Sequence, residues 1–212
     1  MRIRECLIKC RGCLLSIVSA LIGIAAFPQQ AAAHFVLETP ESWMAQSQIG
    51  DPQKPAPCGI TSTASGTPSN IITKVTGGQK LHLKVREIIY HPGHYRVALA
   101  VNGHSELPPD PQTTTRETAR GPWSVSAAIQ NPPRPPLLAD GLFAHTAAAT
   151  TPFEAEIDIP NINCAKCTLQ VIQWMAEHAL NPQGDFSYHH CADLQITADP
   201  AKPIDTRWPK QR

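Results

Sequence analysis

Histidine residues at widely separated positions could together hold a metal ion. His34 follows Ala31-Ala32-Ala33, and small residues three and one positions before a bond are what signal peptidases require. Cleavage there would leave His34 as the first residue, where its α-amine and ring Nδ1 can chelate one ion together. One further imidazole would complete a T-shaped site of three nitrogens, an arrangement that suits Cu(II).

The second imidazole is expected in the segment His91-Pro92-Gly93-His94-Tyr95. This segment lies between two predicted strands, and loop ends at the rim of a sandwich are where binding sites are commonly built. The two histidines are three residues apart in a turn, so both could face a metal, or one could be a surface residue. The sequence does not decide which of them binds.

A third group of possible ligands is Tyr188-His189-His190-Cys191. Tyr188 could close the metal site axially as a weakly bound phenol. His189 and His190 point to opposite faces if a strand has already begun, so at most one of them shares the side of the site. The alternative interpretation is a tyrosine that caps the core, followed by two solvated histidines.

The first 33 residues have the order of a secretory signal peptide. Basic side chains are concentrated in residues 1–13, and residues 14–27 are uncharged and apolar. This apolar run is short for a membrane span and favours export and cleavage, although an uncleaved leader anchored in the membrane would look similar. We therefore expect a secreted or periplasmic protein without a membrane anchor after cleavage, with one domain over residues 34–212.

Four of the seven cysteines lie beyond the predicted leader. An even number of cysteines in an oxidising compartment favours two disulfides over a zinc-binding or reactive thiol pair. Four cysteines allow three pairings, and spacing alone leaves them open. The four residues are Cys58, Cys164, Cys167 and Cys191.

Composition and periodicity predict an all-β protein. The 18 Lys and Arg residues balance 17 Asp and Glu residues, so we expect no nucleic-acid partner. The 21 prolines disfavour long helices and central strands. Period-two alternation predicts an immunoglobulin or fibronectin III-like antiparallel β-sandwich with long loops, and residues 105–152 are expected to be mostly loop. The predicted strands are 71–76, 81–86, 95–102, 153–159, 167–175 and 191–197.

Taken together, these motifs resemble the copper-dependent lytic polysaccharide monooxygenases. The fungal enzymes combine an N-terminal His, an internal His-x-Gly-Pro and a Tyr-x-x-Cys-Ala at the final core strand. The chain is more similar to a bacterial family of exported polysaccharide monooxygenase-like proteins, and this resemblance spans residues 34–197. The shared features are the His34-Phe35 start, Pro57-Cys58-Gly59, the strand entry that begins at His91, the Cys164-x-x-Cys167 motif followed by Thr-Leu-Gln, and a His-Cys-Ala-Asp that begins at His190.

The resemblance implies roles for individual residues. His34 would bind copper through its amine and imidazole, His91 would supply the second imidazole, and Tyr188 would be the axial group. His178 resembles the histidine that hydrogen-bonds oxygen species beside the copper in the fungal enzymes, a catalytic role. It also implies disulfides between Cys58 and Cys191 and, by the remaining pair, between Cys164 and Cys167.

The chain departs from the fungal pattern at two positions. Phe186 stands where those enzymes have a glutamine that orients the oxygen species, and His94 stands where they have proline.

Two functions are therefore expected to compete: oxidative cleavage of a polysaccharide with O₂ or H₂O₂ and an electron donor, or copper binding and exchange with a copper donor. Exposed aromatics would favour a polysaccharide, and the candidates are Trp43, Tyr95 and Trp123. We expect a monomer.

Overall fold

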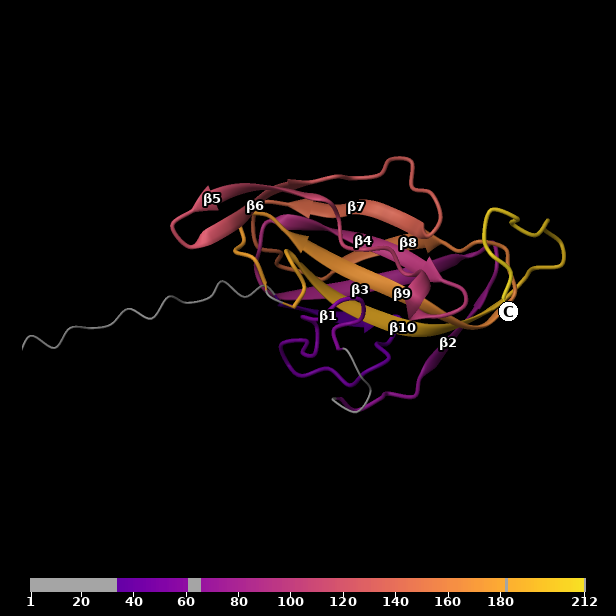
Figure 1. Cartoon of the computed structure of the whole chain (residues 1–212). Helices are drawn as coiled ribbons and strands as arrows, with labels where there is room; N and C mark the ends of the chain where they lie inside the picture. Colours follow the sequence, from indigo (N-terminus) through magenta and orange to yellow (C-terminus); the bar gives the residue numbers. More distant parts are fainter. Residues whose placement is uncertain (1–33, 61–65, 182, 212) are drawn as a thin grey trace, which may run out of the picture.

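The chain folds into two packed β-sheets and a separate hairpin (Figure 1). The computed structural model describes residues 34–60, 66–181 and 183–211, so the predicted signal peptide lies outside the described residues. The strands are β1 (His34–Thr39), β2 (Ile72–Thr76), β3 (Lys80–Ile89), β4 (Gly93–Ala100), β5 (Thr113–Thr118), β6 (Gly121–Ala127), β7 (Leu137–His145), β8 (Phe153–Asp158), β9 (Cys164–Met175) and β10 (Ser187–Thr197), with a short 3₁₀ turn, η2 (His104–Glu106).

The smaller sheet has the strand order β1-β3-β8 and the larger sheet the order β2-β10-β9-β4-β7. Strands β5 and β6 form a two-stranded sheet of their own, and Trp123 of β6 also forms an isolated bridge with Ala179. Neighbouring strands are antiparallel except β2, which runs parallel to β10. This arrangement confirms the predicted all-β sandwich. The immunoglobulin-like connectivity stays a prediction.

The core forms where the apolar faces of the two sheets meet. Leu83 and Val85 of β3 are fully buried, as are Val97 of β4 and Leu169 of β9, and all four belong to one hydrophobic cluster. Burying such side chains contributes about 1.5–3 kcal/mol each. The alternation that predicted the strands is therefore the pattern that packs the sandwich.

All six predicted strands are present, but the prediction of loop over residues 105–152 is wrong. That stretch contains β5, β6 and β7. Strand β5 is mostly exposed, so its threonine-rich sequence has no apolar face that would show alternation. Strand β7 carries a buried carboxylate at Asp140 and a positive-φ glycine at Gly141, which interrupt the pattern.

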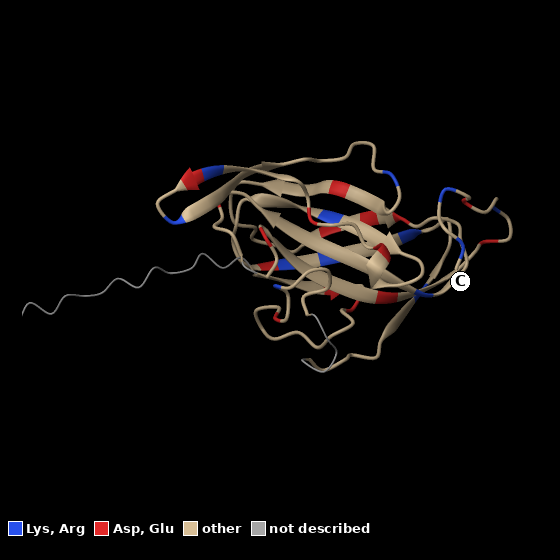
Figure 2. Cartoon of the chain, viewed as in Figure 1, with Lys and Arg blue, Asp and Glu red and all other residues tan. Residues whose placement is uncertain are grey.

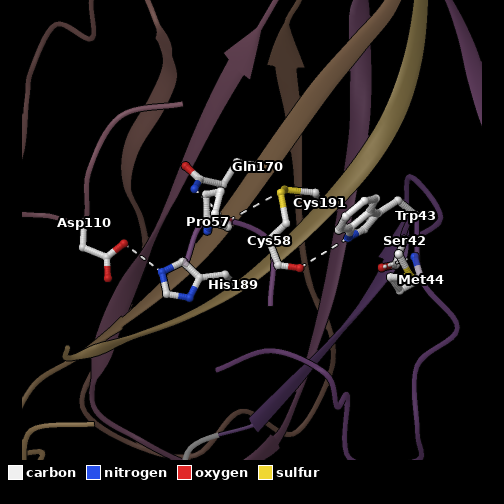
Figure 3. Close-up of a disulfide and its surroundings, with 9 residues drawn as sticks. All are labelled: Ser42, Trp43, Met44, Pro57, Cys58, Asp110, Gln170, His189 and Cys191. Atoms are coloured by element: carbon white, nitrogen blue, oxygen red, sulfur yellow. Dashed lines mark hydrogen bonds and ion pairs between the residues drawn. A yellow bond between two sulfur atoms is a disulfide. The ribbon is translucent and has the colours of Figure 1, made fainter. Parts of the chain in front are cut away.

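Both disulfides have the pairing that the resemblance implied. Cys58 is joined to Cys191 with an S–S distance of 2.04 Å, and Cys164 is joined to Cys167. The first bridge ties the loop after β1 to β10 (Figure 3). Around it, the Trp43 indole donates to the Cys58 carbonyl at 3.3 Å, and the side-chain amide of Gln170 donates to the main chain of the same loop.

Charged residues of both signs are scattered over the strands in Figure 2. On the smaller sheet, Lys84 lies 3.6 Å from Glu38 and 3.5 Å from Glu154. Such exposed pairs contribute at most about 1 kcal/mol each.

In the described ranges, no helix has the length and apolarity needed to cross a membrane.

Candidate metal centre

The predicted metal-binding residues lie at one end of the sandwich because several strand ends meet there. The pairing places His34 opposite Ile89, at the end of β3. Gly93, at the start of β4, is opposite both Met175 and His145, which end β9 and β7. Strand β10 begins beside the end of β9. Long-range pairing thus brings the predicted mature terminus, the loop before β4 and the turn after β9 to the same end.

Four of these side chains form a continuous series of ring contacts. The ring centroids of His34 and Tyr188 are 5.4 Å apart, those of Tyr188 and His178 are 6.4 Å apart, and those of His178 and His91 are 4.7 Å apart. All four residues are at most 8% exposed. The residues to which the resemblance assigned copper binding and catalysis therefore gather in one buried cluster.

His91 and His94 have different surroundings. His91 packs edge-on against His178. His94 instead lies directly opposite Trp174 in the β4–β9 pairing, with the two ring centroids 5.0 Å apart and the rings tilted. Its Nε2 atom is 3.9 Å from the Asp140 carboxylate. His91 is therefore the member of the pair that shares the cluster with Tyr188.

The protonation states of His91 and Tyr188 suit a copper site. Burial, with the neighbouring His178, lowers the pKa of His91 to about 4, so its imidazole is neutral at neutral pH, the form that binds metals. Its Nδ1 atom is buried and has no hydrogen-bond partner in the described part of the chain. Burial and the nearby Asp51 raise the pKa of Tyr188 to about 12, which keeps the phenol neutral, so it could serve a metal only as a weak donor. These side chains fit copper.

The β5–β6 hairpin holds the turn that carries His178. Ser124 of β6 is fully buried, and its hydroxyl donates to the Met175 carbonyl at 2.7 Å while accepting the His178 main-chain N–H at 3.0 Å. The Ser124 main chain also pairs with Glu177 and His178. The imidazole Nδ1 of His178 is 2.5 Å from the Ala179 carbonyl, a contact that helps to fix the orientation of the ring beside His91.

His189 and His190 point to opposite sides of β10, as predicted. Nε2 of His189 lies 2.7 Å from the Asp110 carboxylate (Figure 3), and Nε2 of His190 lies 3.1 Å from the Phe35 carbonyl. The two side chains are 0% and 1% exposed. The alternative interpretation of two solvated histidines is therefore wrong, because both have found buried acceptors.

Sequence reasoning missed a buried polar pair beside the cluster, Glu87 and Gln173. The Glu87 side chain is 2% exposed, and Gln173 is fully buried. Nε2 of Gln173 donates to Oε1 of Glu87 at 3.0 Å. A signal was present: extending the alternation of Leu83 and Val85 by one step places Glu87 on the apolar face of β3, and Gln173 follows Val171 on the apolar face of β9.

The aromatic residues that would have indicated a polysaccharide surface are not exposed. Tyr95 is a fully buried core residue. Trp43 is half-buried and packs on His104 at 4.8 Å, and Trp123 is half-buried with a buried indole nitrogen. The exposed apolar side chains on the segments around the cluster are mainly aliphatic: Ile89, Tyr90, Val125 and Leu180.

No protein-family model matches the chain, and no curated protein matches it. Among the described residues, no group of three or more His, Cys, Asp or Glu side chains is arranged to hold a metal ion. The site predicted from the sequence needs only two imidazoles, because its third nitrogen is a terminal amine.

Proposed function

We propose that the mature protein is an exported copper protein of the histidine-brace type and acts as an oxidoreductase on polysaccharide chains. His34 supplies its amine and imidazole, His91 the second imidazole, and Tyr188 the axial phenol. The observation that carries this proposal is the buried series of ring contacts from His34 through Tyr188 and His178 to His91. Export places it in the periplasm or outside the cell.

Copper in such a site supplies one-electron redox chemistry toward O₂ or H₂O₂, which suits oxidative cleavage of glycosidic chains. The protein's residues then have separate tasks. The neutral His91 ring binds without first losing a proton above pH 4 or so. The main chain of His178 is fixed by Ser124, which places its imidazole as a polar group beside His91 and Tyr188. The neutral phenol of Tyr188 would offer the metal a weak oxygen donor without adding charge.

A second function, copper binding or trafficking without polymer cleavage, is favoured by one observation. The three aromatic candidates for sugar stacking are buried or half-buried, whereas sugar rings are usually held by exposed aromatic faces. In this second function the partner is a copper donor or acceptor instead of a polysaccharide and an electron donor.

A product assay separates the two functions. Natively exported, copper-loaded protein is incubated with a panel of chitin, cellulose and xylan, a reductant and H₂O₂, and oxidised oligosaccharides are detected by mass spectrometry. The oxidoreductase function predicts such products, and they should be lost on His91→Ala substitution. If stoichiometric copper binding is accompanied by no oxidised product from any polymer, the trafficking function is supported instead.

A further inference from the structure

A buried carboxylate lies between the sheets next to the candidate copper site. Glu87 is on β3, directly opposite the fully buried Phe35 of β1, the residue that follows His34. Its side chain is 2% exposed. Placing a charge there is costly unless several donors compensate it, so its contacts should indicate what it does.

One oxygen of Glu87 accepts hydrogen bonds from three other segments. Oε1 lies 3.2 Å from the main-chain nitrogen of His91, 3.0 Å from Nε2 of Gln173 and 3.0 Å from Nε2 of His145. These donors belong to the loop before β4, to β9 and to the end of β7. A single side chain of β3 thus joins both sheets at the end where the cluster lies.

Two of these donors are linked to proposed copper ligands. The first is the main-chain nitrogen of His91, which is itself a proposed ligand. Gln173 is directly opposite Tyr188 in the β9–β10 pairing and opposite Tyr95 in the β4–β9 pairing. Opposed residues share a face of the sheet, so Gln173 stands beside Tyr188 on the core side.

We propose that Glu87 is a positioning residue of the copper site. It fixes the placement of the His91 main chain, and through Gln173 it supports the face that presents Tyr188, while its carboxylate bonds to neither ligand side chain. The role rests on the proposed copper function. Hydrogen bonds to a charged acceptor are roughly twice as strong as neutral ones, which suits an anchor that must hold a ligand-bearing loop.

The test compares variants of the mature protein that begins at His34. Glu87→Ala removes the acceptor, Glu87→Gln keeps an acceptor oxygen, and the exposed Glu156→Ala on the same sheet is the matched control. We expect Glu87→Ala to weaken Cu(II) affinity at least ~10-fold and to change the copper hyperfine splitting in EPR. Glu87→Gln should recover most of the affinity, and Glu156→Ala should match the parent.

A copper-free measurement accompanies the titration. Amide hydrogen exchange at His91 should be slow in the parent and clearly faster in Glu87→Ala, because the main-chain hydrogen bond is lost. If Glu87→Ala does not fold, Gln173→Ala carries the test, because it removes the donor that links Glu87 to the face of Tyr188. A parental EPR spectrum and affinity in that variant would overturn the role. A folded Glu87→Ala with parental affinity, spectrum and exchange would overturn it too. A parent that fails to bind Cu(II) overturns the copper function itself and this role with it.

Discussion

The fold gives His91 and His94 different neighbours although only two residues separate them. His91 contacts His178, and His94 packs against Trp174 near Asp140. His91→Ala should therefore weaken the affinity for Cu(II) by at least ~100-fold, because it removes a ligand itself, and even the loss of a residue that only supports a ligand lowers metal affinity about 10–100-fold. His94→Ala should leave the affinity near that of the parent. Isothermal titration against a competing chelator measures both. A copper signal lost in His94→Ala and kept in His91→Ala would mean that the wrong histidine has been assigned.

Tyr188 is expected to tune the copper site more than to hold the metal. Its pKa of about 12 keeps the phenol protonated, and its ring also contacts His34 and His178. Tyr188→Phe retains these ring contacts, so binding of one Cu(II) per chain should persist while the axial field, seen in the EPR g-values, changes. Loss of binding in a folded Tyr188→Phe would show that the phenol is a principal ligand.

Buried histidines should make the copper-free protein less stable in acid. Burial lowers the pKa of His190 to about 4, against about 6.5 in an unfolded chain. Between these values the unfolded state binds more protons, so stability is fully present above pH 6.5 and is lost as the pH falls toward 4. The loss from His190 between pH 7 and 4.5 should be about 2–3 kcal/mol, measured by urea unfolding. The same dependence in a folded His190→Gln would contradict this assignment.

Single residues differ in how far the sequence could reveal them. His34 follows a cleavage pattern, and Glu87 interrupts an apolar alternation, so both residues can be recognised from the sequence alone. Ser124 is not: its hydroxyl supports the His178 turn through contacts 51 and 54 residues away in the chain, and nothing in its own segment predicts that pairing.

At the scale of elements, the long disulfide should contribute more stability than the short one. Cys58 and Cys191 are 133 residues apart, and Cys164 and Cys167 only 3 apart. In the chain-entropy model these closures contribute about 5 and about 2 kcal/mol. Replacing both cysteines of the long bridge by alanine should lower the free energy of unfolding accordingly, measured by guanidinium denaturation with the short-bridge double variant as control. Equal losses in the two variants would contradict the entropic account.

Five of the six predicted strands have a clear apolar face, and the sixth, β2, is mostly exposed. Strand β1 was not predicted although its Phe35 and Leu37 are buried. Strands β3, β4, β8, β9 and β10 each bury alternate or successive residues in the core. The strands β5 and β6 pair with each other and bury few apolar side chains, so hydrophobic periodicity could not reveal the hairpin. The loop prediction failed there for that physical reason.

At the scale of the whole molecule, the site depends on contacts that bring distant segments to one end of the sandwich. The order of strands β10-β9-β4 places Tyr188 and the loop at His91 near each other, while the pairing of β1 with β3 brings His34 to the same end. Motif order indicated which residues belong together, but only the register of long-range strand pairs shows which histidine of the pair joins them.

The measurement that tests the central claim most directly is Cu(II) EPR on natively exported protein whose intact mass establishes the first residue. The predicted result is a chain that begins at His34 and binds one Cu(II) with nitrogen hyperfine structure, together with loss of tight binding when a single extra residue precedes His34, since the terminal amine then becomes a peptide nitrogen. A mature chain that begins elsewhere, or equal copper binding with and without the extension, would contradict the proposed site.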